Sequence, residues 1–239
     1  MQPVSPIRTD LLLLGAGHAH VEVLRRFAMQ PEPGVRLTLV GREPETPYSA
    51  MLPGLIRGDY RPEQAHIDLA PLAAAAGARL ILAEATGIDL ARREVSVAGR
   101  PPVPYDLLSL NIGGEPAIPE HSEGVGAKPI GQLRERLVAL AESLPAGGRI
   151  AVVGGGAAGT ELALALMRGL RGRARITLVS ETAEPVMQAP ARARRVVRAA
   201  LVDSGVELIS GVSALGLAEG RLHLSDGSEI GRASCRERV

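Results

Sequence analysis

The sequence predicts an α/β protein made of two Rossmann-like dinucleotide-binding domains, the second of which is truncated. A strand–glycine turn–helix–strand pattern occurs twice, and both copies keep the same internal spacing. The chain has 239 residues, of which 46% are hydrophobic and 2% aromatic, so it is long enough for one large domain or two ordinary ones.

The first copy begins near the N-terminus. An apolar strand at Leu11–Leu14 leads into the turn Gly15-Ala-Gly17-His-Ala-His20, and apolar residues then recur at helical spacing. A proline- and glycine-containing stretch at residues 31–34 ends this helix, and the strand Val35–Val40 follows.

The second copy lies 139 residues further along the chain. The strand Ile150–Val153 precedes Gly154-Gly-Gly156-Ala-Ala-Gly159, the helix Thr160–Leu170 and the strand Ile176–Val179. The first glycine and the last valine of the second strand are 25 residues apart in both copies. We therefore interpret the two segments as two copies of one phosphate-binding unit.

The residue types of the turn suit a pyrophosphate. The first glycine makes the tight turn, the second lets backbone approach the phosphates, and the helix N-terminus supplies N–H groups with partial positive charge. The first copy has His20 in place of the third glycine, which predicts looser helix–strand packing there. The sequence predicts two functional nucleotide sites; the alternative is that one or both turns are structural remnants.

A ribose-binding acid is expected after the second strand of each copy. Gly41 and Ser180 come first after the predicted strands, and Arg42 and Glu181 follow. Glu181 would repel a 2′-phosphate and so favours NADH over NADPH. Three nearby arginines argue for NADPH, although solvated loop charges explain them more simply: Arg171, Arg173 and Arg175.

The region between the copies is less regular. Residues 44–60 are dense in turn formers and unlike a regular helix, whereas short β-type runs suggest a β crossover over residues 79–111. An amphipathic helix is predicted at Gln132–Leu144.

Charge and hydropathy exclude several function classes. The net charge of +1 indicates no broad basic surface for nucleic acid, and no apolar run approaches the ~20 residues of a membrane span. No signal peptide is evident, so we expect a soluble, cytoplasmic protein.

The histidines do not predict a metal site. His18 and His20 are expected to diverge at a loop-to-helix junction without a third ligand, so helix capping or phosphate contact explains them better. His66, beside Asp68, is interpreted as a helix cap or a surface hydrogen-bonding residue.

The last ten residues, Ile230–Val239, differ in composition from the rest of the chain. Written as codons, they match one reading frame of a widely used DNA-sequencing adapter; the alternative is a natural arginine-rich tail. The only cysteine, Cys235, lies in this segment. We therefore expect that the natural protein continues beyond it and contains no thiol within the preceding residues.

Four motifs carry a resemblance that covers Leu11–Asp226. They are Gly17-His-Ala-His-Val21, Thr46-Pro-Tyr-Ser-Ala-Met-Leu-Pro-Gly54, Ala65-His-Ile-Asp-Leu69 and Pro102–Gly113. With them the chain resembles the pyridine nucleotide–disulphide oxidoreductase superfamily. It is most similar to the flavoprotein module that some organisms fuse to selenide, water dikinase, itself similar to type II NADH dehydrogenases.

The resemblance implies FAD in residues 1–118 and NAD(P)H in residues 119–229. The residues it implies for FAD are Gly15, Gly17, His18, His20, Arg42 and Gly113. The loop near the isoalloxazine would contain Tyr48, Ser49, Met51 and Pro53, and no individual catalytic residue is assigned. For NAD(P)H the implied residues are Gly154, Gly156, Gly159 and Glu181.

The implied activity is FAD-dependent NAD(P)H oxidation with a quinone or another small molecule as acceptor. Three departures qualify the resemblance: the superfamily's cysteine pair has no counterpart near Tyr48–Pro53, its alanine-threonine-glycine turn reads Asn111-Ile-Gly113, and its C-terminal flavin-binding segment is missing. The alternative is a non-catalytic nucleotide-binding regulatory module linked to selenium metabolism. Peripheral attachment to the inner membrane would depend on a segment outside this chain.

Overall fold

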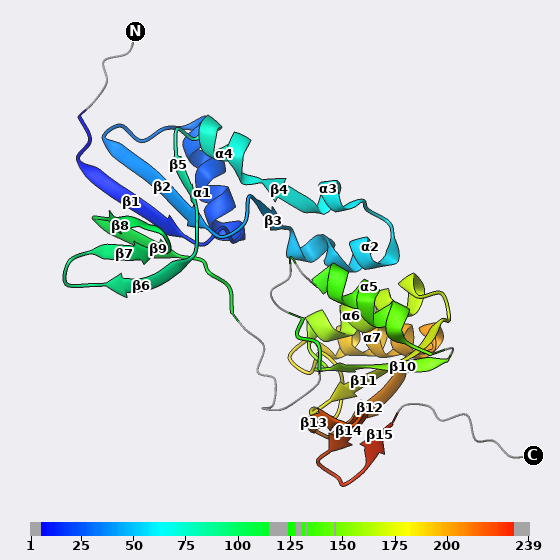
Figure 1. Cartoon of the computed structure of the whole chain (residues 1–239). Helices are drawn as coiled ribbons and strands as arrows, with labels where there is room; N and C mark the ends of the chain where they lie inside the picture. Colours follow the sequence, from blue (N-terminus) through cyan, green and yellow to red (C-terminus); the bar gives the residue numbers. More distant parts are fainter. Residues whose placement is uncertain (1–5, 115–123, 128–130, 132, 146, 232–239) are drawn as a thin grey trace, which may run out of the picture. The chain divides into compact units, whose positions relative to one another are not determined.

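The computed structural model describes residues 6–114, 124–127, 131, 133–145 and 147–231 (Figure 1). The chain divides into two compact units. The first unit contains Met1–Tyr48 and His66–Gly114, and the second contains Ser49–Ala65 and Glu115–Val239. The predicted domain boundary at residue 118 lies outside the described residues.

The first unit contains a four-stranded parallel sheet with the order β5-β2-β1-β9. Its strands are β1 (Thr9–Leu14), β2 (Val35–Gly41), β5 (Arg79–Leu82) and β9 (Leu107–Leu110). The apolar runs in β1 and β2 reflect burial of the sheet on both faces, which is usual for parallel sheets.

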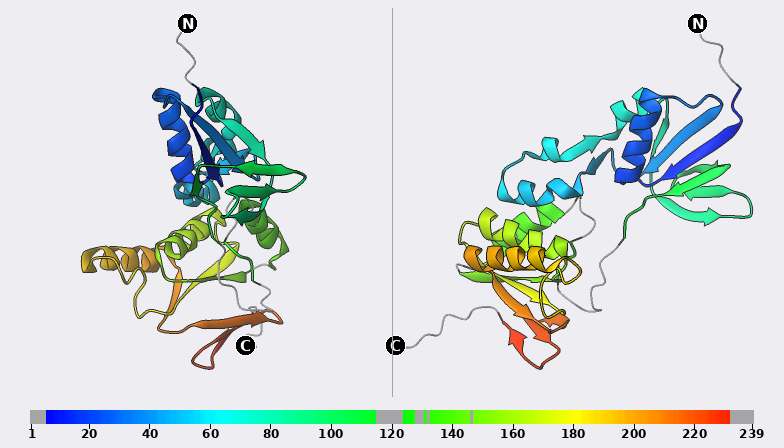
Figure 2. Two further views of the ribbon diagram at one scale, coloured as in Figure 1. Left: turned by 90° about the vertical axis from the view of Figure 1, so that its left-hand side faces the viewer. Right: turned by 180° about the vertical axis from the view of Figure 1, so that it is seen from behind.

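Each face of this sheet has its own core. On one face Leu13 and Leu39 pack with Leu24 of α1 (His18–Met29) and Leu69 of α4 (Leu69–Ala75). The other face is covered by an antiparallel meander of β6 (Ala85–Asp89), β7 (Glu94–Val97) and β8 (Arg100–Pro104), as Figure 2 also shows. The unit is therefore a helix–sheet–meander sandwich.

The predicted crossover over residues 79–111 was too broad. Its first strand, β5, pairs with β2, and its last strand, β9, pairs with β1, so both belong to the parallel sheet. Only β6–β8 form the separate meander. Short apolar runs do not reveal which sheet they join, because that depends on partners distant in sequence.

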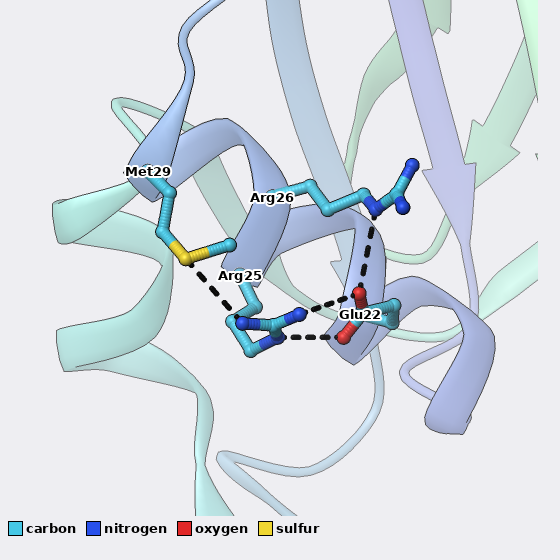
Figure 3. A network of polar contacts seen from close by, with 4 residues as sticks. All are labelled: Glu22, Arg25, Arg26 and Met29. Atoms are coloured by element: carbon cyan, nitrogen blue, oxygen red, sulfur yellow. Dashed lines mark hydrogen bonds and ion pairs between the residues drawn. The ribbon is translucent and has the colours of Figure 1, made fainter.

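The exposed face of α1 carries a network of polar contacts (Figure 3). Arg25 binds both carboxylate oxygens of Glu22 at 2.7 and 2.8 Å and approaches the Met29 sulfur at 3.3 Å, while Arg26 lies 3.4 Å from Glu22. Hydrogen bonding to Arg25 lowers the pKa of Glu22. Such i,i+3 and i,i+4 pairs support the helix on the face that lies away from the sheet.

The second unit repeats this layered arrangement. Its parallel sheet has the order β10-β11-β12, from β10 (Gly148–Val153), β11 (Ala174–Ser180) and β12 (Glu207–Ser210). One face packs against α5 (Leu133–Ser143), α6 (Ala157–Gly169) and α7 (Ala191–Ser204). The other packs against a meander of β13 (Ala214–Ala218), β14 (Arg221–Leu224) and β15 (Glu229–Ile230).

The repeat thus extends beyond the two strands and the helix detected in the sequence to the meander. One difference remains: β1 pairs with both β2 and β9, whereas within the described residues β10 pairs only with β11. Ile230, the first residue of the adapter-like segment, is buried in β15, and residues 232–239 lie outside the described part.

Residues 44–60 are more regular than the sequence predicted. After β3 (Glu45–Pro47) come a 3-10 turn at Ser49–Met51, α2 (Leu52–Arg57), α3 (Pro62–Ala65) and β4 (His66–Asp68). Proline is tolerated in the first turn of α2, and Gly58 ends that helix in the left-handed conformation. Ile56 packs against the core of the second unit, which explains why Ser49–Ala65 belongs there and corrects the predicted domain division.

Candidate functional site

The two glycine turns begin with the same backbone hydrogen bond. Gly15 N–H donates to the Val40 carbonyl at 2.8 Å, and Gly154 N–H donates to the Val179 carbonyl at 2.9 Å. The equal spacing of 25 residues in the sequence therefore corresponds to an equivalent bond at the carboxyl end of each parallel sheet. That end is where ligands bind in open α/β sheets.

In the first turn, Asn111 fills the space beside both glycines. Gly15 has a φ of 90°, and a Cβ there would lie 2.7 Å from the carbonyl carbon of Asn111. A Cβ on Gly17 would overlap the Asn111 side-chain oxygen, which is buried without a hydrogen-bond partner. Sequence reasoning missed this role of Asn111, although its departure from the alanine-threonine-glycine turn was the available signal.

The second turn is open at its middle glycine and closed at its last. Gly154 has a φ of 119°, which favours glycine, and a Cβ on Gly156 would have nothing within 4 Å. A Cβ on Gly159 would overlap the carbonyl oxygen of Gly154. Gly156 therefore leaves room for a ligand, whereas Gly159 is required for close approach of α6 to the turn.

The residue that directly follows the first glycine of each turn faces the last residue of the second strand. In the first unit this pair is Ala16 and Gly41, whose β-carbons would lie 3.5 Å apart. In the second unit it is Gly155 and Ser180, and a Cβ on Gly155 would overlap the Ser180 hydroxyl. Each pair therefore contains one glycine, which lies at the end of the strand in the first unit and in the turn in the second.

His20 does not loosen the first turn as expected. It is 1% exposed, its Nδ1 lies 2.5 Å from the Gly15 carbonyl oxygen, and its Nε2 lies 2.9 Å from the Ser109 hydroxyl. Leu24, one turn further along α1, is completely buried. The imidazole thus fills the gap between helix and strand and replaces the glycine contact with hydrogen bonds.

The burial of His20 predicts a loss of stability in acid. Desolvation lowers the pKa of His20 below its ordinary value of 6.5, with the Gly15 carbonyl opposing part of that shift. The unfolded chain therefore takes up a proton more readily, and His20's contribution to the free energy of unfolding, present above pH 6.5, decreases as pH falls through 6.5 towards the folded pKa.

Thermal unfolding between pH 7.5 and 5 checks this expectation, with His20→Asn as the control that lacks the titrating group. The melting temperature of the parent should fall more steeply than that of the variant. Parallel curves for the two proteins would contradict a lowered pKa of His20.

His18, which belongs to the first motif, contacts the loop at Tyr48. Its ring centroid is 4.7 Å from that of Tyr48, and its Nε2 is 3.2 Å from the Pro47 carbonyl oxygen. Pro47 in turn pairs with His66, because β3 and β4 are antiparallel neighbours. Three of the motifs that carry the resemblance therefore meet in the first unit.

The predicted flavin-proximal loop is divided between the two units. Ser49, Met51 and Pro53 belong to the second unit, whereas Tyr48 belongs to the first. Of the two roles predicted for His66, a helix cap or a surface hydrogen-bonding residue, the cap of α4 is not made by His66. That role falls to Asp68, whose side chain accepts a hydrogen bond from Ala70 N–H at 3.0 Å.

The predicted ribose residues follow the sheet directly. β2 extends through Gly41 and β11 through Ser180, so Arg42 and Glu181 are the first residues after their strands rather than the second. Both side chains are exposed, as is Gly113, which has a φ of 78°. Glu181 therefore lies closer to the expected position of the acid than the sequence suggested.

The three arginines that argued for NADPH lie at the opposite end of β11. Arg171 and Arg173 precede this strand and Arg175 is near its start, whereas Glu181 follows its last residue. A strand of this length spans roughly 20 Å. These arginines therefore do not meet a phosphate bound at Glu181.

The loop after β11 is tied to the second glycine turn. Val186 N–H donates to the Gly155 carbonyl at 2.7 Å, and Arg194 binds Glu184 at 2.7 Å and the Ala189 carbonyl at 3.0 Å. Arg194 is thus engaged in holding the loop.

Within the described residues, no group of three or more histidine, cysteine, aspartate or glutamate residues is arranged to hold a metal ion. In this same part of the chain, no helix combines the length and the apolar character needed to cross a membrane.

The two turns fit dinucleotide pyrophosphates. Neither Gly17 nor Gly156, the N-caps of α1 and α6, has a side-chain cap bond, and no acidic residue lies in the first turn of either helix. Uncapped N–H groups at a helix N-terminus bind anions. The first turn would hold one dinucleotide with Gly15 and Gly17, and the second would hold another with Gly154 and Gly156.

Comparison with known proteins agrees with this geometry. The family model described as pyridine nucleotide-disulphide oxidoreductase matches residues 9–234. No curated protein sequence matches the chain.

Several solved structures share the fold. They include the covalent putidaredoxin reductase–putidaredoxin complex (20% identity, TM-score 0.76, 95% of this chain and 57% of that one). The sulfide:quinone oxidoreductase of Aquifex aeolicus has 18% identity, a TM-score of 0.71, and coverage of 93% and 56%. The water-forming NADH oxidase of Lactobacillus brevis, bound to NADH, has 20% identity, a TM-score of 0.74, and coverage of 94% and 52%. The chain thus spans between half and three-fifths of the length of these proteins.

Proposed function

The chain belongs to the pyridine nucleotide-disulphide oxidoreductase family. From this premise we propose that it forms part of an FAD-dependent NAD(P)H oxidoreductase. FAD would bind at the first glycine turn and NAD(P)H at the second. The observation that carries the proposal is the pair of equivalent, uncapped turns, each at the carboxyl end of a parallel sheet.

Each turn contributes backbone groups to its ligand. Gly15 and Gly17 with the N-terminus of α1 would hold the FAD pyrophosphate, and Arg42 and Gly113 lie exposed at the same sheet edge as further contacts. His18 and Tyr48 would flank this site with their rings. Gly154 and Gly156 would hold NAD(P)H, with Gly159 closing the turn and Glu181 at the ribose.

When bound, the flavin would accept a hydride from the nicotinamide and pass its electrons on. The chain has a single cysteine, Cys235, so the proposal uses no cysteine pair as an intermediate carrier. We propose a quinone or another small molecule as acceptor. Proteins with this fold include a partner of putidaredoxin and a sulfide:quinone oxidoreductase, so the fold alone does not select the acceptor.

The test is anaerobic mixing of the full-length, FAD-loaded protein with NADH, followed at the flavin absorption band, because the fragment alone is expected to be inactive. Bleaching with stoichiometric loss of NADH is the expected result. Bound flavin that stays oxidised would instead support the second candidate, a nucleotide-binding regulatory module. Its link to selenium metabolism and a fusion to selenide, water dikinase stay predictions.

Glu181→Ala is expected to narrow the preference for NADH over NADPH. The carboxylate would repel a 2′-phosphate by about 1 kcal/mol at an exposed site, or roughly fivefold in the ratio of dissociation constants. Asp203→Ala is a suitable control, because Asp203 is an exposed acid on α7 of the same unit. A parent protein that prefers NADPH would contradict this assignment.

A further inference from the structure

In both turns, the carbonyl oxygen of the first glycine contacts the residue at the position of the third glycine of the motif. In the second turn, Gly159 approaches the Gly154 carbonyl so closely that no side chain fits. In the first turn the equivalent residue, His20, has a side chain, and its Nδ1 lies 2.5 Å from the Gly15 oxygen. The same contact is thus made by close backbone approach in one unit and by an imidazole in the other.

The contacts of His20 fix its tautomer. A carbonyl oxygen only accepts hydrogen bonds, so Nδ1 carries the proton and donates to Gly15. In the neutral ring Nε2 then accepts from the Ser109 hydroxyl, 2.9 Å away on β9. Burial keeps the ring neutral, because desolvation lowers the pKa of His20.

We propose that His20 is a positioning residue of the first dinucleotide site, with Ser109 holding its ring so that the Nδ1 proton fixes the Gly15 carbonyl. The C=O and N–H of a trans peptide point in opposite directions. A Gly15 carbonyl held towards His20 therefore directs the N–H of Ala16 to the opposite side of the turn, where a bound pyrophosphate would receive it. This inference rests on the proposed FAD site.

Three substitutions separate this role from mere filling of space. His20→Asn places an amide N–H near the position of Nδ1 and keeps the bond to Gly15. His20→Gln places its amide near Nε2 and keeps only the bond to Ser109. His20→Gly copies the second turn but has neither bond.

The affinity for FAD, measured by flavin fluorescence quenching, should follow the bond to Gly15. We expect His20→Asn to bind within about twofold of the parent, and His20→Gly and His20→Gln to bind about fivefold more weakly, the effect of one lost hydrogen bond. NADH binding by the second unit serves as the internal control and should be unchanged.

Binding by His20→Gly as tight as that of the parent would overturn the inference, as would equal weakening by all three variants, which indicates a packing role alone. A second measurement needs no ligand: imidazole 15N chemical shifts should show the proton on Nδ1. A full-length parent protein that binds no FAD contradicts the proposed function, and a proton on Nε2 contradicts the inference, so the two failures are distinguishable.

Discussion

Gly156→Val is expected to raise the dissociation constant for NADH roughly ten- to a hundredfold, the effect of losing one or two hydrogen bonds to a charged group. The N-cap of α6 has an extended conformation, with φ −71° and ψ 179°, that valine also adopts. A Cβ there would meet nothing within 4 Å. The valine therefore projects into open space, where a pyrophosphate would otherwise approach the backbone.

Isothermal titration with NADH measures this effect, and thermal unfolding checks that the fold is retained. Gly216→Val is the matched control, because Gly216 lies in β13 of the same unit and also has nothing within 4 Å of its added Cβ. Unchanged NADH binding by Gly156→Val would place the nucleotide elsewhere.

Gly159→Ala is expected to destabilise the second unit by roughly 1–3 kcal/mol, the usual cost of overpacking. Its β-carbon would overlap the Gly154 carbonyl oxygen and lie 3.1 Å from the carbonyl carbon. The turn is not free to move away, because Gly154 N–H is bonded to Val179 at 2.9 Å. The start of α6 must shift instead, at the expense of its contacts with the sheet.

Chemical denaturation with hydrogen exchange of the α6 amides measures this loss in the correct unit. Gly216→Ala, in β13 of the same unit and with nothing within 4 Å of its added Cβ, is the control and should unfold close to the parent. If Gly159→Ala is as stable as Gly216→Ala, then α6 does not approach the turn as closely as the structure indicates.

The internal repeat and the α/β fold class could both be predicted from local features of the sequence. The apolar strands, the glycine turns and the equal spacing are local features, and each corresponds to a parallel strand pair and a turn bond at the predicted residues. The family match supports the resemblance drawn from the quoted motifs. The glycine positions of both candidate sites could therefore be read from the sequence, because backbone geometry dictates them.

Sequence reasoning was less successful where a partner lies far along the chain. It assigned β5 and β9 to the crossover, since a run such as Leu107–Leu110 has the same local character in either sheet. It treated Ser49–Ala65 as part of the first domain, because the packing of Ile56 against the second unit leaves no local pattern.

The environment of His20 depends on contacts that form only in the folded protein. The residue was identified as a departure from the glycine motif, but the Ser109 hydroxyl that holds its ring is 89 residues away. β9 brings Ser109 to the first turn by pairing with β1, opposite Leu13. A glycine motif shows which positions require a small residue. Where a larger residue such as His20 stands instead, its hydrogen-bond partners depend on which strand the fold places beside the turn.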